Sequence, residues 1–377
     1  MSRESPRAAS SAGEASAKSS LALQRVEDLL HADAATWKQL RGSSADDFRH
    51  LEDLLLHLHF KRAAPFGPEQ RDRILQYLAL GYLNTGDVRY FNEFLWFDLA
   101  RDHRGRVECE NAFQRNLQEG LHPFPLATPA AVRKFIAQNQ SASAAAHPQV
   151  LPDLRVALIG APQHFGALAD GLERLGLKSD VYYIPAGGGS KLRRWLKANP
   201  LVPRLVSLTR GNFRRYRTLR HSAGDPALGA ELARGAYDIA IHKLSFIIRP
   251  ALIQAFTHGI LNDHLGVLPF VRGRSTLEYS LLYGFPSGAT VHFIDEGVDT
   301  GDLVRVFTYP IDGRRLRTVK AVKREVLRTS DDRFLEIVRS FHKSGVTRFE
   351  NPSPAGLRHY TMHPLLVSHI EKRILPT

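Results

Sequence analysis

A small set of polar side chains in the second half of the chain has the types that acyl transfer needs. Asn262 and His264 lie two residues apart in the apolar run LNDHLGVLPFVRG, and the later run GATVHFIDEGVDTG adds His292 and Asp299. An amide donor stabilises a developing oxyanion, and an imidazole serves as acid, base or cation. A carboxylate orients the imidazole or accepts a proton through water. Acyl transfer to an amine uses these three functions and requires no nucleophilic residue.

Each of these residues also has a structural interpretation. Asn262 would cap a turn, His264 would pack in the core, and Asp299 would occupy a turn, because the sequence Asp-Thr-Gly suits one. A metal site built from His264, His292, Glu296 and Asp299 is an alternative on ligand type. We expect no metal, because the Asn-x-His pattern has an explanation of its own.

The elements that position these residues alternate between strand and helix. Apolar strands are predicted in RVALIGAP, SDVYYIP, YDIAIHKLSF, HGILNDHLGVLP, GATVHFID and DLVRVFTYPI. This alternation predicts a mostly parallel sheet with helices on both faces. Asn262 and His264 would project to the same side of their strand, near the carboxyl ends where active groups gather. Gly160 with Gly166 is too weak a glycine pattern to predict dinucleotide binding.

The rest of the chain predicts three further segments. Residues 1–20 are Ser/Ala-rich and read as a disordered tail. Residues 21–145 carry apolar residues at helical spacing, separated by turn signals, and predict an α-helical accessory domain. The catalytic domain would occupy residues 146–310, followed by a helical extension at residues 311–377.

Composition excludes several classes of protein. The chain has 377 residues, of which 43% are hydrophobic and 24% charged, and contains no apolar run near the roughly 20 residues that span a bilayer. The N-terminus lacks a secretory signal, and Cys109 is the only cysteine, so a reducing cytoplasm fits best. The net charge of +13 suits an anionic partner: a nucleotide, a phosphorylated substrate, folate polyglutamate or nucleic acid.

The two motifs resemble the signatures of the folate-dependent formyltransferases. NDHLGVLPFVRG is similar to the Asn-x-His … Leu-Pro … Arg-Gly signature of that family, and GATVHFIDEGVDTGDLV is similar to its Gly-x-Thr-Val-His … Asp-x-Gly signature. The family includes glycinamide ribonucleotide, methionyl-tRNA and amino-sugar N-formyltransferases. The resemblance covers roughly residues 154–310. It implies an α/β fold with a Rossmann-like, mostly parallel sheet flanked by helices. The α-helical domain expected in front of it departs from the better-known members of the family, which place the catalytic domain first.

The resemblance also implies a role for each site residue. Asn262 would hydrogen-bond the formyl oxygen, with His264 sharing that task. Asp299 would orient His264 and assist proton removal from the attacking amine through an ordered water, while His292 would support the loop that carries Asp299. The co-substrate 10-formyltetrahydrofolate would be held by two segments: Phe246, Ile247, Ile248, Pro250 and Leu252, and Asp295, Glu296, Gly297 and Val298.

A basic stretch lies between the predicted second and third strands. Residues 191–220 contain ten Lys or Arg and no acid. A solvated face is the usual meaning of such a run, although the interleaved aromatics would suit a nucleotide or RNA. Our hypothesis is that an anionic acceptor, or the glutamate tail of the donor, is neutralised by some of Arg210, Arg214, Arg215 and Arg217.

We expect transfer of a formyl group to a primary amine of a small-molecule acceptor, an amino sugar on a nucleotide or an amino-acid derivative. Two alternatives stay open: a 10-formyltetrahydrofolate hydrolase, and a non-catalytic protein that binds RNA or a protein through its basic face. Residues 311–377 are too short and too helical for the β-barrel with which methionyl-tRNA formyltransferases help bind tRNA. We therefore expect no nucleic-acid acceptor and no membrane, and leave the oligomeric state open, with a homodimer as one alternative.

Overall fold

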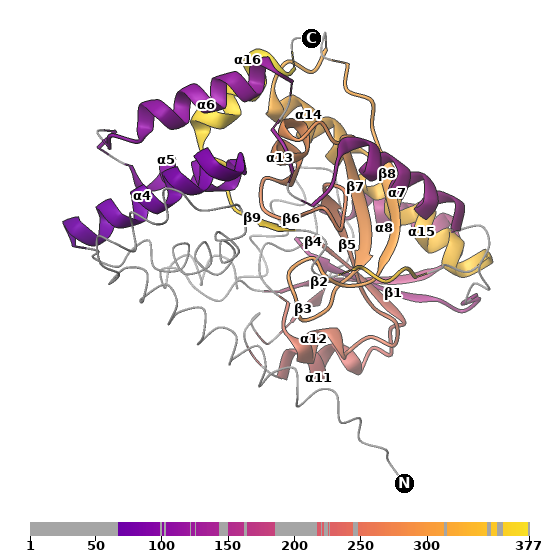
Figure 1. The fold of residues 1–377 in the computed structure, drawn as a ribbon. Helices are drawn as coiled ribbons and strands as arrows, with labels where there is room; N and C mark the ends of the chain where they lie inside the picture. Colours follow the sequence, from indigo (N-terminus) through magenta and orange to yellow (C-terminus); the bar gives the residue numbers. More distant parts are fainter. Residues whose placement is uncertain are drawn as a thin grey trace. The chain divides into compact units, whose positions relative to one another are not determined.

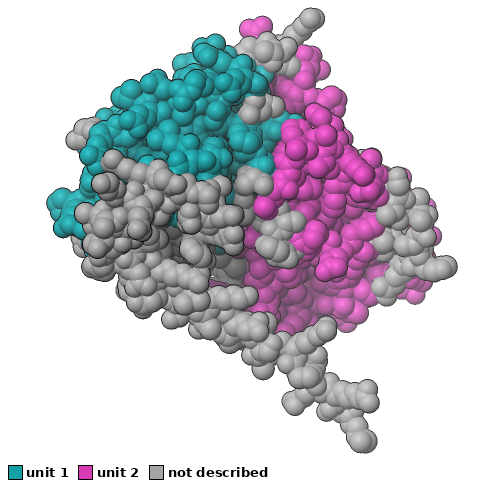
Figure 2. All heavy atoms as spheres, in the orientation of Figure 1, with its two compact units in different colours: residues 1–125, 282–284, 357–374 teal, residues 126–281, 285–356, 375–377 magenta. Residues whose placement is uncertain are grey.

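The structure is a computed structural model. It describes residues 67–98, 100–101, 103–120, 122–124, 126–142, 150–161, 164–184, 217–219, 221, 225, 227–243, 248–312, 315–344, 348–352 and 357–375. The predicted tail at residues 1–20 lies outside these residues. The chain divides into two compact units (Figure 2), which we call the helical unit (up to residue 125, with 282–284 and 357–374) and the sheet unit (126–281, 285–356 and 375–377).

The sheet unit contains a mixed sheet in the order β3-β2-β1-β4-β5-β7-β8. Its strands are β1 (Arg155–Gly160), β2 (Lys178–Tyr183), β3 (Arg217–Thr218), β4 (Ile239–Lys243), β5 (Gly259–Leu265), β7 (Gly288–Phe293) and β8 (Leu303–Thr308). The pairs from β3 through β5 are parallel, and β5–β7 and β7–β8 are antiparallel. The prediction of a mostly parallel sheet is confirmed.

Helices cover both faces of this sheet, as predicted (Figure 1). One face packs its apolar side chains against α8 (Gly166–Arg174) and α15 (Ser330–Lys343). The other packs against α11 (Ala227–Ala233) and α12 (Pro250–Ile253). After the exposed Arg155, strand β1 is buried on both faces and carries no polar side chain, unlike a strand with one face in water.

Three more helices belong wholly or largely to the sheet unit: α7 (Pro129–Ala142), α13 (Thr276–Leu282) and α14 (Val319–Arg328). Helix α7 is tied to strand β8, where the backbone N–H of Val306 donates to Asn139 Oδ1 at 3.3 Å. The division into units therefore differs from the boundaries expected from the sequence. Helix α7 lies in the predicted accessory domain and α14 and α15 in the predicted extension, yet all three group with the sheet. The functional roles of those segments stay predictions.

The helical unit contains α4 (Pro68–Thr85), α5 (Val88–Phe97), α6 (Arg106–Gln118) and α16 (Pro364–Arg373). Helix α4 begins at a proline and ends at Gly86, whose φ of 70° suits a residue without a side chain. Asp87 caps α5 by accepting the N–H of Arg89 at 3.0 Å. Cys109 is buried, and burial raises the pKa of its thiol to about 12, which makes it a packed rather than a reactive cysteine.

Short strands β6 (Val271–Gly273) and β9 (Leu357–His359) complete the described elements. Among the described residues, no helix combines the length and the apolar character that a membrane crossing needs.

Candidate active site

Two neighbouring antiparallel strands carry the polar residues that the sequence singled out. Asn262 in β5 pairs with His292 in β7, and His264 pairs with Thr290, so these side chains share one face of the sheet. The pairing of β4 with β5 stops at Leu261. The polar part of β5 therefore lies beyond its last backbone pair with β4, at the carboxyl edge of the parallel sheet where ligands bind in such folds.

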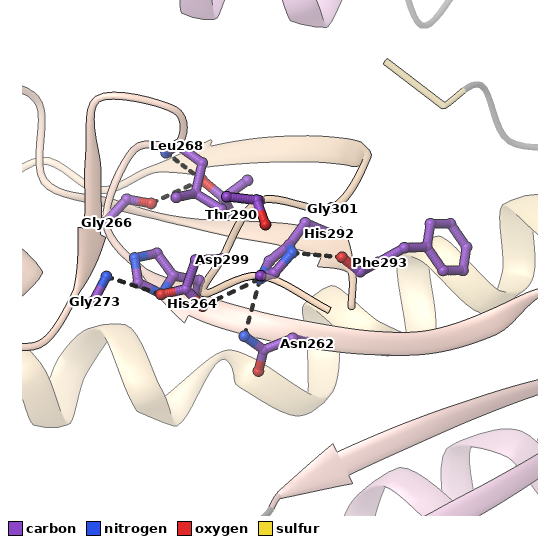
Figure 3. Close-up of polar contacts among 12 residues, drawn as sticks. Asn262, His264, Gly266, Leu268, Gly273, Thr290, His292, Phe293, Asp299 and Gly301 are labelled. Atoms are coloured by element: carbon purple, nitrogen blue, oxygen red, sulfur yellow. Dashed lines mark hydrogen bonds and ion pairs between the residues drawn. The ribbon is translucent and has the colours of Figure 1, made fainter. Parts of the chain in front are cut away.

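Asp299 joins the two histidines (Figure 3). It lies in the turn between β7 and β8. One carboxylate oxygen, Oδ2, is 3.4 Å from Nδ1 of His264, and the other, Oδ1, is 3.7 Å from Nε2 of His292. The backbone N–H of Gly273 donates to Oδ2 at 2.8 Å. Each oxygen of this one carboxylate therefore faces a different imidazole.

The backbone at Asp299 is held in an uncommon conformation. Its φ of 56° lies in the left-handed region, which Asp tolerates better than most residues with a side chain. Asn351 fixes the turn from the outside: its Nδ2 donates to the carbonyl oxygens of Asp299, at 3.0 Å, and Gly301, at 3.1 Å. Sequence reasoning did not find Asn351, because it lies 52 residues beyond Asp299 with no motif to connect them.

The hydrogen bonds of His264 fix how its ring is oriented. Nε2 lies 3.0 Å from the carbonyl oxygen of Val271, so this nitrogen carries a proton and donates it. Nδ1 is then the nitrogen that faces Asp299. A proton taken up at Nδ1 would give an imidazolium that is paired with the carboxylate and that donates from both nitrogens.

The ring of His292 has a different role in the cluster. Its Nδ1 donates to the carbonyl oxygen of Phe293 at 2.7 Å. Burial lowers the pKa of His292 to about 4, so the ring is neutral near pH 7. Nε2 of a neutral ring with a proton on Nδ1 is an acceptor, and Nδ2 of Asn262 therefore donates to it at 3.0 Å.

The pKa of Asp299 lies below its ordinary value. Burial by itself would raise this pKa, but the opposing influences outweigh it. The largest of these are the positive charges that His264 and His292 can carry. The N–H of Gly273 and the guanidinium of Arg272 add to them. Asp299 is therefore an ionised carboxylate at neutral pH, ready to accept a hydrogen bond or a proton.

A cavity of about 260 Å³ lies along this part of β5. Its wall is made by Asn262, Asp263, His264, Leu265, Gly273, Ser275, Thr276, Leu277 and Lys323. Lys323 comes from α14 and forms an ion pair with the buried carboxylate of Glu278. A cavity of this volume is smaller than a typical ligand pocket, so it suits a reacting group rather than a whole substrate.

Most of the residues expected to hold the donor lie in two described segments. Ile248 and Leu252 are buried in the core beneath the sheet, with Pro250 at the first position of α12. Asp295, Glu296 and Gly297 are exposed in the turn before Asp299, while Val298 is half-buried. Within that turn, Oδ1 of Asp295 accepts the N–H of Gly297 at 3.0 Å and the hydroxyl of Thr300 at 2.7 Å. Donor binding by these residues stays a prediction.

Other predicted binding residues lie outside the described part of the chain: Phe246, Ile247, Arg210, Arg214 and Arg215. The backbone of Arg217 forms part of β3, but its side chain is outside the description. Among the described residues, no group of three or more His, Cys, Asp or Glu is arranged to hold a metal ion.

The structure adds one residue to the cluster that the sequence analysis overlooked. His242, near the end of β4, shares a side-chain hydrogen bond with Asn262. Burial, and after it the neighbouring His292, lowers the pKa of His242 to about 4. The signal was present in the apolar strand YDIAIHKLSF, where one His stands at the carboxyl end. It is visible only once β4 is known to lie beside β5.

An α/β sheet whose carboxyl edge presents an amide, imidazoles and a carboxylate defines a protein with the groups for acyl transfer. Residues 154–337 of the chain match the model of the formyl transferase family. That match includes β1 through β8 and all the polar residues described above except Asn351. The resemblance noted from the two motifs is thereby confirmed.

Curated relatives match a part of the chain. A methionyl-tRNA formyltransferase from Rhizorhabdus wittichii is 29% identical over 166 residues, which is 43% of this chain and 51% of that relative. The trifunctional purine biosynthetic protein adenosine-3 from Chironomus tentans is 30% identical over 169 residues, 43% of this chain and 12% of that relative. The chain thus spans about half the length of the first relative and much less of the second.

Solved structures also align with the chain. A 4-N formyltransferase from Francisella tularensis aligns over 56% of this chain and 78% of its own, with 17% identity and a TM-score of 0.41. The formyltransferase PseJ from Anoxybacillus kamchatkensis, in complex with UDP-4,6-dideoxy-4-formamido-L-AltNAc and tetrahydrofolate, aligns over 58% and 88%, with 19% identity and a TM-score of 0.36. The family assignment depends on the sequence match and not on these scores.

Proposed function

We propose that this protein transfers the formyl group of 10-formyltetrahydrofolate to the primary amine of a small-molecule acceptor. The observation that carries the proposal is the carboxylate of Asp299, which faces His264 and His292 at 3.4 and 3.7 Å beside the amide of Asn262. These groups lie at the carboxyl edge of the sheet, inside the region that matches the formyl transferase family.

The reaction forms one C–N bond and breaks another. The acceptor amine attacks the formyl carbon, and the bond from that carbon to N10 of the folate breaks. The formyl oxygen becomes an oxyanion in between, and the second N–H of the Asn262 amide stabilises it together with a protonated His264. Asp299 accepts the proton that the attacking nitrogen loses, through water, and the proton returns to N10 as tetrahydrofolate leaves.

The acceptor proposed is an amino sugar on a nucleotide or an amino-acid derivative. The net charge of +13 favours an anionic acceptor, because a basic protein attracts one over several ångströms. The methionyl-tRNA formyltransferase matches this chain along only half of its length, so its substrate does not carry over to this chain. The cavity next to His264 has room for the reacting amine and not for the whole acceptor.

The purified protein tests the proposal. It is incubated with 10-formyltetrahydrofolate and a panel of nucleotide-linked amino sugars and amino-acid derivatives, and tetrahydrofolate, formate and formylated amine are measured separately. We expect amine-dependent release of tetrahydrofolate with stoichiometric formylated product. Release of formate in step with tetrahydrofolate would show a hydrolase instead. A protein that neither binds nor consumes the donor would overturn the proposal.

A further inference from the structure

A histidine outside the two sequence motifs contacts the amide that would act on the formyl oxygen. In β4, Ile241 pairs with Leu261 of the parallel strand β5, so the next residues, His242 and Asn262, project from the same face. A side-chain hydrogen bond joins these two residues. His242 stands where β4 is ending, directly beside the site and not in the core beneath it.

The Nδ2 end of the Asn262 amide already has a hydrogen-bond partner, His292. Because Nδ1 of His292 donates to the carbonyl oxygen of Phe293, Nε2 accepts one N–H of Asn262. The amide then has a second N–H and the oxygen Oδ1 for further partners. The torsion that turns a terminal amide is broad and two-fold, so a single contact leaves the orientation weakly held.

We propose that His242 is a positioning residue for Asn262, and that its ring N–H donates to Oδ1 of the Asn262 amide. With His292 on one end and His242 on the other, the amide is clamped in one orientation. Its second N–H then points toward the formyl oxygen, and Oδ1 is turned away from the developing negative charge. This inference rests on the proposed function and assigns to His242 a role within that same site.

The protonation of the two imidazoles agrees with this clamp. Burial lowers the pKa of both His242 and His292 to about 4. Near pH 7 each ring is neutral and has one N–H and one acceptor nitrogen. His292 can therefore accept from the amide while His242 donates to it. Neutral rings orient the amide without placing a second positive charge next to His264, which is the imidazole that faces Asp299.

The test compares five variants with the unmodified full-length protein. His242→Phe removes the hydrogen bond and keeps a flat ring, whereas His242→Gln retains an N–H donor of similar reach. Asn262→Ala and the double variant with His242→Phe form a cycle. His258→Phe is the matched control, because His258 directly precedes the opposite end of β5 and its backbone, not its side chain, makes the contacts with Asp238 and Arg348.

We expect His242→Phe to lower kcat about 100-fold, the loss that misplacing a catalytic group typically causes, with KM for the donor unchanged. His242→Gln should recover most of this loss, and His258→Phe should behave as the unmodified protein. In the Asn262→Ala background, His242→Phe should change kcat by no more than about twofold, because its effect acts through the amide. Additive losses in the double variant, or full activity of His242→Phe, would overturn the proposal.

A second measurement does not depend on turnover. The two protons on Nδ2 of Asn262 give separate NMR signals whose chemical shifts and exchange with water depend on the hydrogen bonds of the amide. We expect both signals to shift and to exchange faster with water in His242→Phe, and to stay as in the unmodified protein in His242→Gln and His258→Phe. Unchanged signals in His242→Phe would refute the clamp. If the unmodified protein transfers no formyl group, the proposed function fails, and these signals still decide the role of His242.

Discussion

Buried polar groups on the two faces of strand β5 have different hydrogen-bond environments. On one face, Nδ1 of His264 lies 3.4 Å from Oδ2 of Asp299, and Nδ2 of Asn262 lies 3.0 Å from Nε2 of His292. On the reverse face, Asp263, which also borders the cavity, accepts from two donors: Nε of Arg333 at 2.8 Å and the hydroxyl of Ser330 at 2.6 Å. Alternate residues of one short strand therefore have two environments, one in the candidate site and one against α15.

The reverse face has its hydrogen-bonding capacity filled. Arg333 is only 2% exposed, and its Nη1 also donates to the hydroxyl of Tyr309 at 2.7 Å and of Thr329 at 2.8 Å and to the carbonyl oxygen of Val326 at 2.9 Å. A buried ion pair of this kind is tolerable only when such partners complete it. A buried charge whose hydrogen-bond partners are all present therefore indicates a structural contact. The longer contact between His264 and Asp299 lies in the candidate active site.

The largest expected effect is on the cavity face. Asp299→Asn keeps the size of the side chain and removes the charge that faces His264. We expect kcat/KM for formyl transfer to fall about 10³-fold, within the range for loss of an acid–base group, with only a modest fall in the unfolding temperature, because the ionised Asp299 also contributes to stability. Steady-state kinetics with saturating donor measure it. Unfolding at a much lower temperature would mean that this face is structural like its reverse.

The next effect should appear on the reverse face. Arg333→Met leaves the carboxylate of Asp263 buried without its main partner, and we expect a loss of about 3–5 kcal/mol in unfolding free energy. Urea denaturation measures it. The double variant Asp263→Leu with Arg333→Met removes both charges and should recover most of the stability. If Arg333→Met alone were as stable as the unmodified protein, the contrast between the faces would be wrong.

A pH profile gives a smaller effect. The pKa of His292 falls from 6.5 to about 4 on folding, so between these values the unfolded chain binds the extra proton and the folded protein does not. Its contribution is therefore complete above pH 6.5, declines as the pH falls toward 4, and is lost below that. The full change is about 3 kcal/mol, since one pKa unit is about 1.4 kcal/mol. Urea titrations from pH 4 to 7 measure it.

His292→Gln is the control for that profile. It should flatten the decline between pH 6.5 and 4, after allowance for His242, whose pKa is also lowered to about 4. Asp299 acts at lower pH and in the same direction. Because its pKa is lowered in the folded protein, the ionised carboxylate stabilises the fold above the ordinary carboxyl pKa, and this contribution is lost as the pH falls further. A decline of equal size in His292→Gln would show that other groups cause it.

Much of this arrangement followed from the sequence. The strand that carries Asn262 and His264, their common face and the alternation that forms the sheet were all local patterns of period two or of short apolar runs. What the sequence did not indicate depends on neighbours that are distant along the chain. The partner of Asp263 lies 70 residues away in α15, and the register that sets His242 beside Asn262 arises only when β4 and β5 pair.

The positive φ at Asp299 shows the same limit. The sequence GVDTG predicted a turn, but not that Asn351 would hold it from 52 residues away. The roles of the predicted donor-binding and acceptor-binding residues still await measurement.

The smallest expected effect concerns this turn. Asn351→Ala removes two hydrogen bonds to the backbone around Asp299, and we expect kcat to fall about tenfold because the carboxylate is less well held. The matched control is Asn116→Ala, which removes a side-chain donor to the hydroxyl of Tyr82 at 3.2 Å in the helical unit. Asn116→Ala should lower the unfolding free energy by about 1 kcal/mol, as Asn351→Ala should, and should leave kcat unchanged.

The two asparagine variants separate positioning from general loosening. A loss of kcat in Asn351→Ala alone, with donor KM preserved, places the effect on the carboxylate that faces His264. Equal losses in both variants would instead mean that kcat follows overall stability, and Asn351 would then belong with Asp263 and Arg333 among the structural contacts. The contrast between the two faces of β5 would remain, but the turn that carries Asp299 would no longer be part of the chemistry on the cavity face.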